Sequence, residues 1–133
     1  MHLRAVVLLV CALLVLPVLA TAEEIESFTT TITLSPDGGF VVNEEIQYDF
    51  GGSERRGIFR DIPLNHPQSA GKWYKDRVIA VRLTDVTRNG SAEPYAVTES
   101  GRTLRVRIGD PDVTITGTHT YTLTYEVAGG LTY

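Results

Sequence analysis

Four charged side chains in one glycine-flanked segment are the first candidates for chemistry in this sequence. Arg55, Arg56, Arg60 and Asp61 follow a pair of glycines and alternate with apolar residues. Arginines on such a segment can bind a carboxylate or a phosphate through two parallel hydrogen bonds. The apolar residues between the charges favour a second interpretation, in which the segment docks on a core and Arg60 pairs with a carboxylate of the domain itself. The segment is therefore a candidate loop for a ligand or partner, and the structural interpretation is the favoured one.

An aromatic pair follows in the polar stretch after this segment. Trp73 and Tyr74 lie between two lysines, Lys72 and Lys75. Aromatic rings on a loop can form a platform for a sugar, which is typical of carbohydrate-binding modules, although packing of the loop explains the same pair equally well. Trp73 and Tyr74 therefore join the candidate loop, with a cell-envelope glycan as the alternative to a protein partner.

Other polar residues do not form a catalytic pattern. The sequence has no nucleophile elbow, phosphate-binding loop, dinucleotide fingerprint or zinc-protease motif. His119 falls on the apolar face of a predicted strand, where a half-buried histidine with one hydrogen bond is expected, and His66 has no evident partner. Asp110 and Asp112 flank a proline, as turn residues do, and lack the loop that calcium requires. We therefore expect no enzyme activity, no cofactor and no metal.

The first residues show the parts of a secretory signal peptide in the correct order. Arg4 gives a short positive region, residues 6–16 form an uncharged apolar stretch, and Ala20-Thr21-Ala22 is a small-residue cleavage site. A proline just after the apolar stretch disfavours an uncleaved membrane anchor. We therefore predict a signal peptide over residues 1–22 and one extracytoplasmic domain over residues 23–133.

The composition narrows the function classes further. The whole chain has 12 basic and 16 acidic residues, and the predicted signal peptide contains one of the basic ones. A nucleic-acid partner needs a basic face, so this acidic domain is not expected to bind one. The one cysteine, Cys11, lies in the predicted signal peptide. The exported domain therefore has no disulfide, no thiol nucleophile and no cysteine-based zinc site.

Short alternating segments separated by turn residues predict an all-β domain. The predicted strands cover residues 25–34, 40–50, 77–88, 93–98, 103–108 and 118–127, with a shorter one at 113–115. Asn89-Gly90 is typical of a two-residue hairpin turn. Residues 51–76 are predicted to be irregular and partly pinned to the core. This spacing of strands and turns predicts an antiparallel immunoglobulin-like β-sandwich.

The first two predicted strands carry clear apolar faces. Phe28, Ile32 and Leu34 share one face of the first strand. In the second strand the apolar face has one exception, Glu44. The Pro36-Asp37-Gly38 turn between them predicts an antiparallel hairpin with one buried and one wet face.

Several motifs of the mature chain resemble a known family. They are Ile25-Glu26-Ser27-Phe28, Pro36-Asp37-Gly38, Arg56-Gly57-Ile58-Phe59-Arg60-Asp61-Ile62-Pro63, Arg107-Ile108-Gly109-Asp110-Pro111 and Gly117-Thr118-His119-Thr120-Tyr121. In this order they resemble the N-terminal region of the DUF2207 family, the YciQ-like predicted bacterial membrane proteins. The resemblance implies a signal peptide, an exported β-rich portion and later transmembrane helices. It implies no assigned catalytic residue, so none is transferred to this chain.

Together these observations predict a non-catalytic interaction or sensing domain of a membrane-anchored protein, with a carbohydrate-binding module as the alternative. The domain is expected on the outer face of the cytoplasmic membrane. Its anchor would be a C-terminal region absent from this chain, which would make the chain a fragment. A chain that truly ended at Tyr133 would instead be secreted.

Overall fold

The chain folds into antiparallel β-sheets. The structure is a computed structural model, and it describes residues 22–36, 38–66 and 77–128. These residues form strands and the turns between them. No helix in this part of the chain is long and apolar enough to cross a membrane. Residues 1–21, which hold most of the predicted signal peptide, lie outside the described residues.

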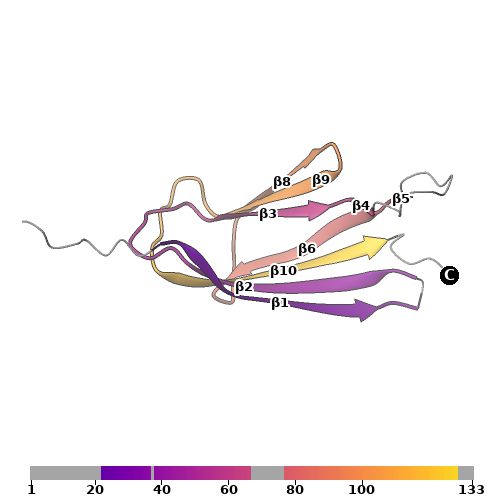
Figure 1. Cartoon of the computed structure of the whole chain (residues 1–133), viewed down its shortest axis with the longest axis horizontal. Helices are drawn as coiled ribbons and strands as arrows, with labels where there is room; N and C mark the ends of the chain where they lie inside the picture. Colours follow the sequence, from indigo (N-terminus) through magenta and orange to yellow (C-terminus); the bar gives the residue numbers. More distant parts are fainter. Residues whose placement is uncertain (1–21, 37, 67–76, 129–133) are drawn as a thin grey trace, which may run out of the picture.

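Two sheets stack as the layers of a sandwich (Figure 1). Among the described residues, the larger sheet has the order β1-β2-β10-β6-β7, the smaller has the order β3-β9-β8, and β4 pairs with β5. The bounds are β1 Glu24–Leu34, β2 Phe40–Asp49, β3 Ile58–Pro63, β4 Asn65–His66, β5 Arg77–Val78, β6 Ala80–Arg88, β7 Ser91–Ala92, β8 Tyr95–Ser100, β9 Thr103–Ile108 and β10 Thr118–Ala128. The predicted all-β sandwich is confirmed, and its immunoglobulin-like character stays a prediction.

Turn chemistry explains how neighbouring strands pair. The β1–β2 hairpin closes through Ser35, whose N–H donates to the carbonyl of Gly39 at 2.9 Å. The β6–β7 hairpin turns at Asn89 and Gly90, which have φ values of 51° and 79°. Both residues of a type I′ turn need positive φ, and Asn-Gly meets that need at low cost. The turn that this dipeptide predicted is therefore confirmed. The returning strand is only Ser91–Ala92, and the expected pairing of residues 93–98 back across the turn is wrong, because β8 pairs with β9 instead.

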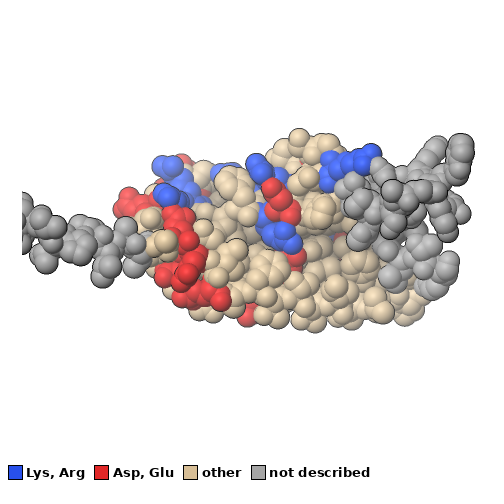
Figure 2. Space-filling model, viewed as in Figure 1, with Lys and Arg blue, Asp and Glu red and all other residues tan. Residues whose placement is uncertain are grey.

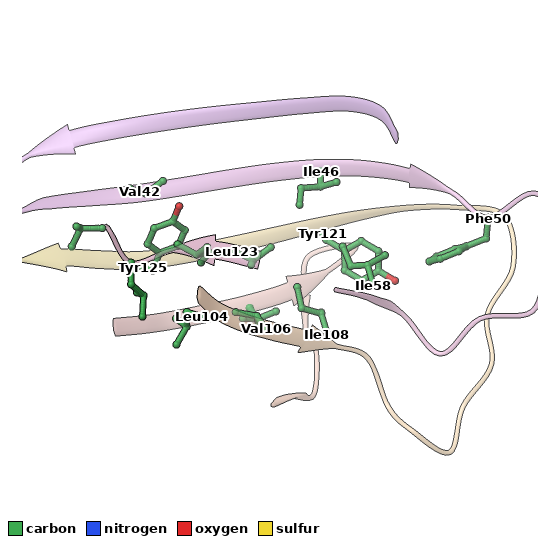
Figure 3. Packing of buried hydrophobic residues seen from close by; sticks show 14 residues of the cluster. Val42, Ile46, Phe50, Ile58, Leu104, Val106, Ile108, Tyr121, Leu123 and Tyr125 are labelled. Carbon is green, nitrogen blue, oxygen red and sulfur yellow. The ribbon is translucent and has the colours of Figure 1, made fainter. Parts of the chain in front are cut away.

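The core lies between the two sheets and is built from their alternating inward residues (Figure 3). Its largest fully buried side chains are Tyr121, Phe50, Ile108, Leu123 and Val106. Each large apolar side chain of this kind stabilises the fold by about 1.5–3 kcal/mol relative to exposure. Desolvation by this burial raises the pKa of Tyr121 to about 12.

Part of the segment predicted to be irregular is a regular strand. β3 places Ile58, Arg60 and Ile62 toward the core and pairs along its length with β9. The alternation was hidden in the sequence because an arginine occupies the middle inward position. Its partner is Glu44, the one charged residue on the apolar face of β2.

A pair of glycines sets the distance between β3 and β9 at one end. Gly57 and Gly109 have φ values of 120° and 132°. A Cβ atom on Gly57 would lie 1.8 Å from the carbonyl oxygen of Ile108, and one on Gly109 would lie 1.9 Å from that of Arg56. No real Cβ approaches a backbone oxygen so closely, so each position accepts only glycine without moving the chain.

We predict that Gly57→Ala destabilises the domain by about 3 kcal/mol, because the new methyl group must push the two backbones apart at a positive φ. Equilibrium urea unfolding measures the change. Gly52→Ala is the matched control, because nothing lies within 4 Å of its Cβ position. Equal stability of the two variants would contradict the close approach of β3 and β9.

Candidate functional site

The candidate loop residues from the sequence are distributed over both faces of β3 and the turn before it. Arg55 and Arg56 precede the strand, and Arg60 and Asp61 lie within it. Neighbours in a strand point to opposite faces, so Arg60 reaches inward whereas Asp61 reaches outward. Trp73 and Tyr74 lie outside the described residues. The four charged residues therefore do not converge on one point.

Arg60 forms a two-bond ion pair with a buried carboxylate. Its Nε donates to Oε2 of Glu44 at 2.7 Å, and its Nη2 donates to Oε1 at 2.7 Å. The hydroxyl of Tyr125 donates to the same Oε1 at 2.9 Å. Glu44 is only 2% exposed. The cluster of Glu44, Arg60 and Tyr125 therefore joins β2 and β10 of one sheet to β3 of the other.

The ionisation of this cluster follows from its contacts. The hydrogen bond to Glu44 raises the pKa of the Arg60 guanidinium, which stays charged. Burial, and then the bond to Glu44, raises the pKa of the Tyr125 hydroxyl, which stays protonated and keeps donating. A buried carboxylate is tolerated when a charge and further hydrogen bonds satisfy it. The geometry is that of a structural ion pair, as the favoured interpretation of Arg60 predicted.

Asp61 makes the corresponding pair on the outer surface. Nε and Nη2 of Arg105 each donate to one Asp61 oxygen at 2.7 Å. The Arg105 guanidinium also lies 5.6 Å from the centre of the Phe59 ring. The hydrogen bonds from Arg105 hold the pKa of the Asp61 carboxyl below its usual range. This pair ties β3 to β9 in water, where such pairs stabilise little.

The two arginines before β3 have different surroundings. Arg55 pairs with Glu23, which also accepts a hydrogen bond from the hydroxyl of Tyr48 at 3.3 Å. Arg56 instead lines a hollow of about 230 Å³ that it shares with the Arg88–Glu93 ion pair. Three of the four charged candidates are thus bound to groups of the domain, and both Arg55 and Arg56 border a hollow.

His119 has a structural role in this part of the chain. Its Nε2 donates to the carbonyl of Thr116 at 2.9 Å, so Nδ1 is the acceptor. That acceptor lies 3.0 Å from Nδ2 of Asn89 in the hairpin turn. The half-buried histidine predicted from the sequence is confirmed. No group of three His, Cys, Asp or Glu side chains that could hold a metal occurs among the described residues.

The surface feature that the sequence did not predict is β1. All of its residues are exposed, including the apolar side chains of its predicted core face. Phe28, Ile32 and Leu34 are 45%, 56% and 67% exposed. They pair opposite Ile46, Val42 and Phe40 of β2, respectively, and face the same side as these residues. We call Phe28, Thr30, Ile32 and Leu34 the inner row of β1. The sequence predicted that the apolar side chains of this row would be buried, and that prediction is wrong.

The inner row is exposed because the smaller sheet is narrower than the larger one. The Arg60–Glu44 ion pair places β3, the outermost strand of the smaller sheet, over β2. The Arg60 guanidinium reaches only the nearest side chain of β1, at 5.4 Å from the centre of the Phe28 ring. Ile32 and Leu34, farther along the row, remain 56% and 67% exposed in the part of the chain that the structure describes. The alternation in the sequence showed which residues share a face, and it could not show how wide the facing sheet is.

We predict that Arg60→Met destabilises the domain by about 3 kcal/mol, since it leaves the buried Glu44 carboxylate without its counter-charge. Adding Glu44→Met to this variant should restore most of the lost stability, because the double variant buries no charge. The free energies of unfolding of the parent, both single variants and the double variant form the test.

Arg105→Met is the matched control for these variants, because it breaks the Asp61–Arg105 pair, which has the same two-bond geometry but lies on the outer surface. Its effect on stability should be small, since water replaces the lost partner. A loss in Arg105→Met as large as that in Arg60→Met would show that burial of the Glu44 pair is not what makes it important.

Comparison with known proteins identifies a family for this chain. The family model described as "Predicted membrane protein (DUF2207) N-terminal domain" matches residues 24–133. No curated protein and no solved structure matches the chain. The match covers every described strand, including the β3 and β9 segments that the Gly57–Gly109 contact and the Asp61–Arg105 pair bring together. The chain therefore belongs to the DUF2207 family, as the N-terminal domain of a predicted membrane protein.

Proposed function

We propose that this domain is a non-catalytic interaction module, displayed outside the cytoplasmic membrane by the membrane protein to which it belongs. Its contact surface is the exposed strand β1. The observation that carries the proposal is the inner row of β1, where apolar side chains at strand spacing are about half exposed or more. An exposed row of this kind beside an open strand edge is typical of a binding surface.

The backbone of β1 supports the same surface. β1 pairs with β2 on one side and is the end strand of the larger sheet. No described strand pairs with the other side, so among the described residues that edge presents N–H and C=O groups along the 11 residues of β1. Edge strands that must stay alone usually carry lysine or proline, and β1 has neither. An extended segment of a partner can therefore add to the sheet through main-chain hydrogen bonds.

The remaining candidate residues also support an interaction role. Arg60 and Asp61 are paired with Glu44 and Arg105 rather than presenting free charges. The family description, that of a predicted membrane protein, supports attachment to a membrane. The signal peptide predicted at residues 1–22 supports its display on the outer side.

Site-specific photo-crosslinking in cells that export the intact protein tests this proposal. A photo-reactive phenylalanine analogue at Phe28 should give adducts with another polypeptide chain, because the partner strand would lie beside it. The matched control is Tyr95 on β8, an aromatic residue whose exposed fraction is 44% against 45% for Phe28. Adducts from Tyr95 but none from Phe28 would contradict the assignment of β1 as the contact surface.

A further inference from the structure

The sequence of β1 also points to the partner. We infer that β1 pairs with β1 of a second copy of this chain, antiparallel, with Thr30 of one copy directly opposite Thr30 of the other. This inference rests on the proposed function, since it assigns an occupant to the same strand edge. The two copies would then share one continuous sheet across a two-fold axis.

The backbone allows only some alignments of the two strands. In an antiparallel ladder, opposite residues either both point their N–H and C=O groups at each other or both point them away. Both copies have the same alternation along β1, because each already bonds β2 without a bulge from Ser27 to Leu34. Opposite residues must therefore both have even numbers or both have odd numbers. Every allowed alignment consequently sets the inner row of one copy opposite the inner row of the other.

Side-chain matching selects one of the allowed alignments. With Thr30 opposite Thr30, Phe28 of each copy faces Ile32 of the other. An aromatic side chain opposite a β-branched one is a favourable cross-strand pair. With Thr31 opposite Thr31, the next allowed alignment, Phe28 would face Leu34, but Ile32 would face the hydroxyl of Thr30. From Phe28 to Ile32, the first alignment pairs apolar with apolar and hydroxyl with hydroxyl on the inner face, and Leu34 lies beside the irregular start of the other strand.

The outer face of β1 fits the same alignment. It would set Thr29 of each copy opposite Thr31 of the other, and Ser27 opposite Thr33. Threonine and serine hydroxyls opposite one another can hydrogen-bond across strands. The outer face therefore offers no mismatch of polar and apolar groups.

The charges of β1 favour an antiparallel partner over a parallel one. The strand begins with Glu24 and Glu26 and has no charged residue from Ser27 to Leu34. Acidic side chains gather at the end of the domain where β1 begins (Figure 2). In the antiparallel pair, the acidic start of each strand lies beside the uncharged end of the other. A parallel pair would place like charges side by side, which is destabilising.

The expected dimer is weak in solution. A single pair of edge strands buries less surface than the roughly 1,200–2,000 Å² of a stable protein interface. Display on a membrane raises the local concentration of the domains and so favours pairing without any new contact. Covalent trapping is therefore the appropriate test.

A cysteine scan of β1 tests the partner and the alignment together. The variants Thr29→Cys, Thr30→Cys and Thr31→Cys are made in the intact exported protein with Cys11→Ala, and oxidised mildly. Opposite Cα atoms in an antiparallel ladder lie about 4.5–5.5 Å apart, within the range a disulfide spans. Thr30→Cys should form a disulfide-linked dimer at least about tenfold faster than either neighbour. Mixing Thr29→Cys with Thr31→Cys should give the mixed dimer, because these positions face each other.

Other outcomes overturn the inference in distinguishable ways. Fastest trapping of Thr31→Cys would show self-pairing in the other alignment and overturn the Thr30 register. Equally slow trapping at all three positions, with Phe28 still giving photo-adducts of a different protein, would overturn self-pairing and leave the proposed function standing. Slow trapping at all three positions together with no photo-adduct at Phe28 would overturn both the self-pairing and the proposed function. Urea unfolding of each reduced variant checks the fold, and no loss is expected because all three threonines are exposed.

Discussion

The ion pair between Glu44 and Arg60 is the contact on which the arrangement of the two sheets depends. Glu44 and Arg60 are the charged residues that interrupt the apolar inward faces of β2 and β3. The Arg60 guanidinium donates two hydrogen bonds of 2.7 Å to the Glu44 carboxylate, so each charge satisfies the other. The hydroxyl of Tyr125 completes the site from β10. Since a buried charge without its partner is costly, the pair permits one lateral position of β3 over β2. Apolar packing alone would tolerate neighbouring positions far better.

That position explains the surface as well as the core. The Arg60–Glu44 pair sets β3, an edge strand of the smaller sheet, against β2, and β1 lies on the other side of β2. The inner row of β1 therefore continues the apolar face of the core into water. The close contact of Gly57 with Gly109 holds the same strand β3 against β9. The buried ion pair and the exposed row are thus two consequences of one placement of β3, and the proposed partner would extend the sheet that β1 now ends.

Much of this fold could be predicted from the sequence, because strands and tight turns are local signals. The alternation of the last strand and the Asn89-Gly90 turn were both identified correctly, whereas the strand expected to return across that turn pairs with β9 instead. β3 was missed because its alternation includes Arg60, whose partner Glu44 is 16 residues away in the chain. The exposure of Phe28 and Ile32 was missed because it depends on the width of the facing sheet. The structural interpretation of Arg60 needed only its apolar neighbours, and it proved correct.

Amide hydrogen exchange along β1 tests most directly the claim that this strand is an open edge. In a dilute sample, amides that bond to β2 should exchange slowly, and the alternate amides, which face the open side, should exchange fast. The fast set should become protected as the protein concentration rises, if β1 pairs with a second copy. Protection of both sets at every dilution would contradict the account, because it would mean that the edge is already covered within one chain.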